Sequence, residues 1–222
     1  MGEDLWSKVD SYIDGKLLAG DPALQWVLQA SDEAGLMPIA VSPSQGKFLN
    51  LLVKLRGAER VLEIGTLGGY SAIWMALGLP KDGKLVALEI DPKAVDVARA
   101  NFKKAGVDPV AELRSGPALA SLQELVKEKA GPFDLIFIDA DKPSYPDYLA
   151  WSLKLSRVGT VILLDNMVRK GEIVTSPEGD ARVVGARKTY DMIAREPRLS
   201  ATALQTVGVK GHDGFVMALV VA

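Results

Sequence analysis

The fold of this chain is determined by the stretch Val61-Leu-Glu-Ile-Gly-Thr-Leu-Gly-Gly-Tyr-Ser71. It opens with a short apolar run bounded by turn residues, as expected for a buried parallel strand. Gly65, Gly68 and Gly69 carry no Cβ, so the backbone can turn sharply there and approach a ligand closely. At Ser71 an apolar run begins a helix, whose free N–H groups point back at the turn. Strand, turn and helix predict the first unit of a nucleotide-binding α/β domain.

The ligand of this turn is predicted from the glycine spacing and from one acidic residue. The glycines do not follow the G-x-G-x-x-G spacing of dinucleotide-binding turns. Glu63 precedes the first glycine, and its carboxylate would repel a pyrophosphate but attract an amino group or a ribose. The turn therefore favours an adenosine ligand without phosphates, and an NAD-dependent dehydrogenase is a disfavoured alternative.

Composition and charge limit the class of protein. The chain has 222 residues, of which 48% are hydrophobic and 24% charged, as is typical of a single globular domain. A net charge of -2 provides no general attraction for nucleic acid or anionic membranes. No apolar run reaches the ~20 residues needed to cross a bilayer, and the N-terminus is acidic where a secretion signal would be basic. We therefore expect a cytoplasmic protein.

Cysteine and histidine content restricts the chemistry further. The chain has 0 cysteines, which excludes disulfides, thiolate metal ligands and cysteine nucleophiles. Its single histidine, His212, excludes a site of several histidines and is interpreted as a turn residue rather than a catalyst. Any metal ion must therefore be held by oxygen atoms.

Helices are expected before the nucleotide-binding unit. Between residues 5 and 35, Asp21-Pro22 is typical of a helix cap followed by a first-turn proline. The apolar residues that repeat on one face of this segment are Leu24, Val27 and Leu28. The next helix is predicted to have Ser44 as its N-cap and to end at Gly57. Its predicted buried stripe consists of Phe48, Leu51, Leu52 and Leu55.

Strands and helices then alternate, which predicts a parallel sheet covered by helices on both faces. The expected strands are 60–64, 84–90, 110–113, 133–139 and 160–165, and the expected helices are 70–78, 92–105, 117–129, 145–155 and 183–196. Residues 167–185 are predicted to form a long surface loop, and 201–207 and 215–221 an antiparallel hairpin that closes the sheet. We expect one domain over 1–222, with 1–40 as a helical lead-in and 41–222 as its core.

Acidic residues stand at or near the ends of the predicted strands, where ligands bind in parallel sheets. Glu89 has the spacing of an acid that accepts hydrogen bonds from ribose hydroxyls, although it could be a solvated carboxylate. Asp139 and Asp165-Asn166 would start roughly 5 Å apart if their strands are neighbours. Two carboxylates and an amide oxygen suit Mg²⁺. The alternative is a turn dipeptide and a strand-end cap.

Basic residues complete this candidate site. A cation would push Lys142 toward its neutral form, so that it could act as a general base toward a hydroxyl group. The alternative is an exposed loop lysine. Further basic residues flank the predicted loop and are either solvated or contacts for an anionic part of a substrate: Arg169, Lys170, Arg182, Arg187 and Lys188.

Several segments together resemble the metal-dependent S-adenosylmethionine O-methyltransferases, that is, the caffeoyl-CoA and catechol O-methyltransferase-like enzymes. The segments that carry the resemblance are Glu63–Ser71, Leu88–Asp91, Gly116–Leu119, Phe137–Lys142 and Asp165-Asn166. The similarity runs from about residue 41 to the C-terminus. It implies a Rossmann-like class I methyltransferase fold with a mostly parallel, seven-stranded sheet, a reversed last strand and helices on both faces.

The resemblance also implies roles for individual residues. Lys142 would be the catalytic base. Asp139, Asp165 and Asn166 would hold a divalent cation, Mg²⁺ with Mn²⁺ or Ca²⁺ as alternatives, and Asp139 would also act near the methionine part of the cofactor. The residues expected to bind S-adenosylmethionine are Val41, Glu63, Gly65, Thr66, Ser71, Glu89, Ala118 and Asp139.

One departure from the family pattern affects the expected substrate. The catechol enzymes carry an aromatic residue just before the matching lysine, where this chain has Asp141. This favours the bacterial and plant branch over a mammalian-type catechol pocket. We expect a homodimer that methylates one hydroxyl of a catechol-type or caffeoyl-type small molecule. A tRNA nucleoside is an alternative acceptor, disfavoured by the net acidity. A non-catalytic nucleotide-binding regulator is disfavoured by the intact acid, amide and lysine set.

Overall fold

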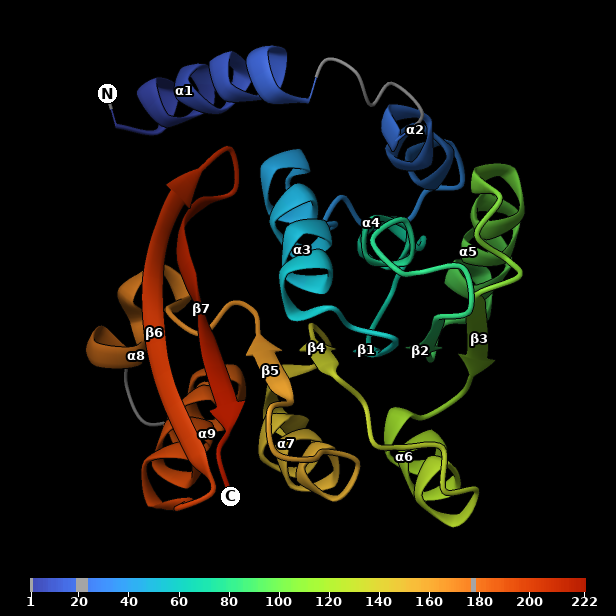
Figure 1. Cartoon of the computed structure of the whole chain (residues 1–222). Helices are drawn as coiled ribbons and strands as arrows, with labels where there is room; N and C mark the ends of the chain where they lie inside the picture. The colour runs from blue at the N-terminus through green and yellow to red at the C-terminus, as the bar shows by residue number, and fades with distance from the viewer. Residues whose placement is uncertain (1, 19–23, 177–178) are drawn as a thin grey trace.

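The computed structural model describes residues 2–18, 24–176 and 179–222, which form one mixed sheet flanked by helices (Figure 1). The strands are β1 (Arg60–Ile64), β2 (Lys84–Glu89), β3 (Ala111–Ser115), β4 (Leu135–Ile138), β5 (Val161–Leu164), β6 (Leu199–Gly208) and β7 (Gly211–Val220). Their order in the sheet is β3-β2-β1-β4-β5-β7-β6. Strands β1 to β5 are parallel, whereas β7 runs antiparallel to both β5 and β6. The predicted seven-stranded sheet with a reversed last strand is confirmed.

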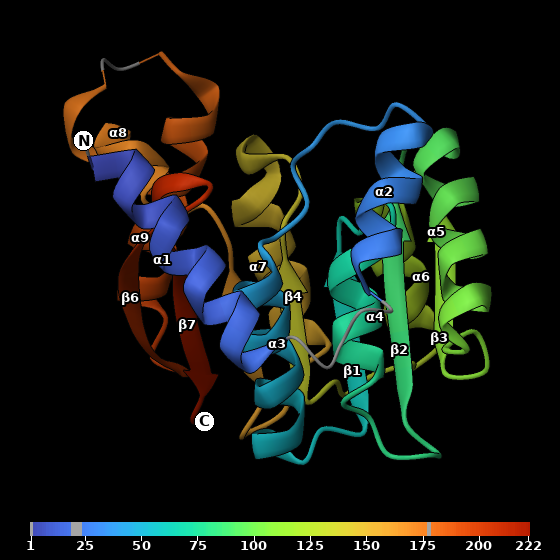
Figure 2. The same ribbon diagram turned by 90° about the horizontal axis from the view of Figure 1, so that it is seen from above.

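Helices cover both faces of this sheet, as predicted. They are α1 (Gly2–Leu17), α2 (Gln25–Glu33), α3 (Pro43–Arg56), α4 (Tyr70–Ala76), α5 (Pro92–Ala105), α6 (Ala118–Lys127), α7 (Tyr145–Lys154), α8 (Glu172–Thr175) and α9 (Ala181–Arg195), with short 3-10 turns η2 (Lys142–Ser144) and η3 (Arg169–Gly171). One buried cluster joins the sheet to α3, α4 and α5, and a second joins it to α6, α7 and α9. Helix α1 lies against α3 and β6 at one end of the sheet (Figure 2).

Caps define the helix ends, with one correction to the predictions. Asp91 accepts a hydrogen bond from the backbone N–H of Lys93, and Gly57 and Gly106 end their helices in the left-handed conformation, as expected. The predicted N-cap Ser44 is wrong. Ser42 caps α3 instead, because its hydroxyl accepts from the N–H of Gln45 at 3.2 Å. The Ser44 hydroxyl donates to Asp14.

The predicted buried stripe of α3 was also partly wrong. Leu55 is 83% exposed and Leu51 is 45% exposed, whereas Phe48 and Leu52 are half-buried. The residues that α3 buries are Gly46, Leu49, Asn50 and Val53. The apolar pattern of α3 is therefore wider than one face, and only packing selects the face that meets the sheet.

Other predicted segments differ from the structure mainly in their boundaries or in their secondary structure. Residues 167–185 are not a structureless loop, because they contain η3, α8 and the start of α9, and Met167 is fully buried. Strand β3 lies slightly later than predicted, and His212 lies within β7, paired with Val207 of β6, rather than in a turn. The predicted cap Asp21-Pro22 lies outside the described residues. Within the described ranges, no helix combines the length and apolar character required to span a bilayer.

Candidate active site

A cavity of about 630 Å³, here called the first cavity, opens at the carboxyl ends of β1, β2 and β4. Parallel sheets bind ligands at this edge. The predicted cofactor residues that line it are Val41, Gly65, Thr66, Ser71, Glu89, Ala118 and Asp139. Among the predicted cofactor residues, only Glu63 is not in the lining. Predicted residues from Val41 to Asp139, far apart in the sequence, thus line one cavity.

The glycine turn lets β1 and β4 end in close contact. Gly65 has φ +88°, and a Cβ at this position would overlap the carbonyl group of Asp139. Gly69 also has φ +88° and forms the N-cap of α4, where a Cβ would press on Phe102. Only glycine adopts this backbone conformation without strain, so the turn brings the backbone of β1 directly against the first candidate catalytic acid.

Glu89 is oriented by backbone groups at the end of β2. Its Oε2 accepts from the N–H of Leu67 at 2.8 Å, and its Oε1 accepts from the N–H groups of Ile90 and Asp91 at 2.8 and 2.9 Å. These bonds join the glycine turn to β2. A carboxylate oxygen accepts more than one hydrogen bond, so Glu89 keeps acceptor capacity toward the first cavity, as a ribose-binding acid requires.

Glu63 is buried and does not line the first cavity. Its side chain is fully buried in β1, behind the cavity wall, and its oxygens have no hydrogen-bond partner among the described residues. Burial raises the pKa of Glu63 to about 8, and the nearby hydroxyls of Ser71 and Thr66 offset only part of this rise.

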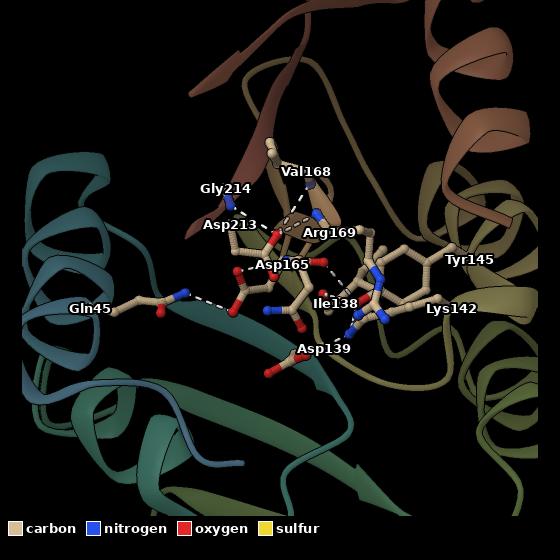
Figure 3. A network of polar contacts seen from close by, with 11 residues as sticks. Gln45, Ile138, Asp139, Lys142, Tyr145, Asp165, Val168, Arg169, Asp213 and Gly214 are labelled. Atoms are coloured by element: carbon tan, nitrogen blue, oxygen red, sulfur yellow. Dashed lines mark hydrogen bonds and ion pairs between the residues drawn. The ribbon is translucent and has the colours of Figure 1, made fainter. Parts of the chain in front are cut away.

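The acids at the ends of β4 and β5 are neighbours, as predicted. Ile138 pairs with Leu164 in the parallel ladder, so Asp139 and Asp165 directly follow paired residues (Figure 3). Asp165 is buried, and its carboxylate accepts from Gln45 Nε2 at 2.7 Å and from the backbone N–H of Asn166 at 2.8 Å. Burial, and next the charge of Asp139, raise the pKa of Asp165 to about 7.

Lys142 is not an exposed loop residue. Its side chain is buried, and its Nζ donates to Asp139 Oδ1 at 2.9 Å and to the hydroxyl of Tyr145 at 2.8 Å. Tyr145 in turn donates to the backbone carbonyl of Ile138 or Asp165. Burial raises the pKa of Tyr145 well above its ordinary value, so this hydroxyl stays protonated. Gly185 of α9 packs directly on the Lys142 backbone, where a Cβ would overlap its carbonyl group.

A second cavity of about 470 Å³ lies beside the first. The two share Ile39, Ala40, Val41, Asn166 and Arg169 in their linings. The second cavity is completed by residues from α1, α3 and the β6–β7 turn: Asp10, Gln45, Phe48 and Lys210. Asp165 lines only this cavity, whereas Asp139 and Lys142 line only the first, so the two predicted acids border different cavities.

Several residues of the site were not predicted. Gln45 carries no sequence signal, since it lies 120 positions before the acid that it contacts. Gly185 was assigned only to the edge of a loop. Tyr145 could have been found, because it follows Lys142 by three positions at the start of a helix, a spacing that brings side chains together.

The predicted cation ligands have a suitable composition for a hard metal ion. The described residues contain no group of three or more acids, histidines or cysteines that could hold a metal. The predicted set has two carboxylates, Asp139 and Asp165, and depends on the amide oxygen of Asn166 for its third ligand. Asp165 is buried beside the charge of Asp139, and both effects raise its pKa. A cation bound between the two carboxylates would reduce their mutual repulsion.

The strand order, the glycine turn after β1 and the acid that ends β2 define a Rossmann-like nucleotide-binding protein. Comparison with known proteins is consistent with this. The family profile described as O-methyltransferase matches residues 21–219, so the chain belongs to the O-methyltransferase family, as its sequence motifs predicted.

Individual relatives are similar over nearly the whole chain. A catechol O-methyltransferase of Mycobacterium tuberculosis is 51% identical over 212 residues, which cover 96% of this chain and 94% of the relative. The O-methyltransferase from Bacillus cereus in complex with SAH superimposes with a TM-score of 0.96 at 53% identity, covering 98% of this chain and 99% of that one. The O-methyltransferase TomG from Streptomyces achromogenes, in complex with SAM, has a TM-score of 0.96 at 44% identity and 100% coverage of both chains.

Proposed function

We propose that this O-methyltransferase transfers the methyl group of S-adenosylmethionine to one hydroxyl of a catechol-type or caffeoyl-type small molecule, with the help of a divalent cation. The observation that carries the proposal is the buried Lys142, which lines the first cavity and whose Nζ lies 2.9 Å from Asp139 Oδ1. A binding protein would gain nothing from this burial, because a lysine is costly to bury. A general base between donor and acceptor explains it.

The relatives support both reactants. The structures from Bacillus cereus and Streptomyces achromogenes contain SAH and SAM respectively, and the Mycobacterium tuberculosis relative is named a catechol O-methyltransferase. We assign the donor to the first cavity, where Glu89 would accept hydrogen bonds from ribose hydroxyls and Gly65 would let the methionine part approach the backbone. We assign the acceptor to the second cavity, to which the 1–40 segment contributes Asp10, Ile39 and Ala40.

The protein groups contribute binding, orientation and one proton transfer. Lys142 would take the proton of the acceptor hydroxyl, and Asp139 and Tyr145 hold its Nζ in position. When bound, S-adenosylmethionine supplies a methyl group on a positively charged sulfur, and a cation held by Asp139, Asp165 and Asn166 would lower the pKa of the hydroxyl. The chain must then mainly align oxygen, carbon and sulfur and exclude water.

The test is methyl transfer from labelled S-adenosylmethionine to a panel of catechols, hydroxycinnamoyl thioesters and undermodified tRNA, with and without EDTA. We expect product from a catechol-type acceptor that disappears with EDTA and returns with Mg²⁺. Turnover that persists in protein shown to contain no metal would overturn the cation assignment. If tRNA alone is methylated, the acceptor is a tRNA nucleoside and not a catechol-type small molecule.

We also propose that the chain forms a homodimer through α1 and β6. Leu5, Val9 and Tyr12 follow one another at helical spacing on α1, and their exposed fractions are 59%, 47% and 67%. On the adjacent edge strand β6, Leu204 and Val207 are also more than half exposed. Apolar stripes of this kind mark protein interfaces. Light scattering should give twice the chain mass for the wild type, and a monomer would contradict the proposal.

A further inference from the structure

Arg169 is an arginine without a counter-charge at the boundary of the two cavities. It is half-buried and lines both cavities. Its side chain makes no ion pair or hydrogen bond with any described residue, and its Nε is buried. The other arginines that are not exposed, namely Arg56, Arg60, Arg114 and Arg187, each donate to a carbonyl or a carboxylate. Arg169 therefore differs from every comparable arginine in the described part of the chain.

The backbone holds Arg169 in place without neutralising it. Asp213 Oδ1 accepts from the backbone N–H groups of Arg169 and Val168 at 2.8 and 3.2 Å, and from its own neighbour Gly214 at 2.9 Å. Arg169 has φ +55°, a left-handed conformation that non-glycine residues adopt rarely and that clusters at ligand-binding sites. The carboxylate of Asp213 is thus used to fix the backbone, and the guanidinium is left facing the cavities.

The other acids that line the cavities have partners of their own. Asp139 is paired with Lys142, Asp165 accepts from Gln45, and Glu89 accepts from backbone N–H groups. In the second cavity Asp10 accepts from the N–H of Val209 at 2.6 Å. A guanidinium cannot lose its proton and is costly to leave half-buried without an anion. A bound anion would give this guanidinium the charged partner that the described residues do not provide.

We propose that Arg169 binds a carboxylate of the methyl acceptor, so that the enzyme prefers catechols that carry an acidic side chain. This proposal rests on the proposed function. The planar guanidinium matches a carboxylate with two parallel hydrogen bonds, which gives orientation as well as affinity. Binding the acid end of the ring at Arg169 would leave the vicinal hydroxyls free to face Lys142 and the strand-end acids.

The position of Arg169 favours the acceptor as the source of the carboxylate over the cofactor. Arg169 follows β5, and the cofactor residues of the glycine turn and of Glu89 follow β1 and β2 on the other side of β4. Its side chain extends toward Lys142, the proposed base for the acceptor hydroxyl (Figure 3). Lys210, at the tip of the β6–β7 hairpin, lines the second cavity together with Arg169 and adds a second positive charge there.

The test compares protocatechuate with its uncharged methyl ester, which has the same catechol ring. The ratio of kcat/KM for the acid to that for the ester is measured in the wild type and in Arg169→Gln. Because a charge-assisted pair is lost, we expect the ratio to fall about 10- to 100-fold, through a higher KM for the acid. Arg169→Lys keeps the charge and should retain part of the preference.

Lys170→Gln is the matched control, since Lys170 is an exposed neighbour with the same φ of +55° and lines neither cavity. Its ratio should equal that of the wild type. An unchanged ratio in Arg169→Gln would overturn the proposal. Equal losses for acid and ester, with weaker binding of S-adenosylmethionine by calorimetry, would assign Arg169 to the cofactor carboxylate and also overturn it.

A failure of the proposed function can be distinguished from a failure of the Arg169 proposal. If the wild type methylates neither compound, the methylation of catechols is contradicted, and calorimetry of protocatechuate against the SAH-bound protein still tests Arg169. Weaker binding to Arg169→Gln than to the wild type would support the carboxylate site. Equal binding would overturn it.

Discussion

The two cavities lie side by side but are built in different ways. The first is formed mainly by consecutive strand-to-helix connections after β1, β2, β3 and β4, so short sequence motifs supply most of its wall. The second is assembled from α1, α3, the segment after β5 and the tip of the β6–β7 hairpin. A cavity at consecutive strand ends can thus be encoded by local motifs, whereas a cavity assembled from several segments depends on how those segments pack.

The largest expected effect is that of replacing Lys142. Lys142→Met removes the proposed base, and we expect kcat to fall roughly 10²- to 10⁴-fold, as for other lost general bases. Calorimetry with SAH should show that cofactor binding largely survives, which also verifies folding. Lys188→Met, an exposed substitution on α9, is the control. Turnover within a few-fold of the wild type would remove Lys142 from the mechanism.

A smaller effect is expected in the first cavity. Glu89→Gln removes a charged acceptor and also places an amide against the N–H groups of Leu67, Ile90 and Asp91. We expect affinity for S-adenosylmethionine to fall about 10- to 100-fold, with a smaller change in kcat at saturating donor. Glu59→Gln, exposed at the opposite end of β1, should match the wild type. A higher KM for the acceptor, with donor binding unchanged, would instead assign the acceptor to the first cavity.

A still smaller effect is expected in the second cavity. Gln45→Ala removes the 2.7 Å hydrogen bond to Asp165, and we expect kcat/KM for the acceptor to fall about 10-fold without weaker donor binding. The exposed Gln123→Ala on α6 is the control. If Gln45→Ala instead weakens donor binding, the two cavities do not act separately.

The smallest effect concerns stability and pH. Burial raises the pKa of Glu63 from its ordinary 4.5 to about 8, so within this window the folded chain keeps a proton that the unfolded chain has released. Stability of the ligand-free protein should therefore fall as the pH rises through the window. Glu63→Gln does not titrate, so its Tm should decline less than that of the wild type. Parallel Tm curves would contradict the raised pKa.

Sequence motifs predicted the first cavity well and the second poorly. The glycine turn, Glu89 and the pair of Asp139 and Lys142 lie in short segments whose spacing fixes their places at strand ends. Ser44 and Leu55 were misassigned, because several polar or apolar residues of α3 were equivalent until the helix packed on the sheet. Gln45 was missed because its partner is distant in the chain.

The amino-acid sequence by itself determined the alternation of strands and helices, the glycine turn and the identity of the strand-end acids. These follow from local periodicity, from the backbone freedom of glycine and from the shared edge at which parallel strands end. Only the tertiary structure decided that Glu63 is buried behind the cavity wall and that Lys142 is held by Tyr145. It also decided that Arg169 has no internal partner, because burial and ion pairing depend on packing between segments that spacing does not relate.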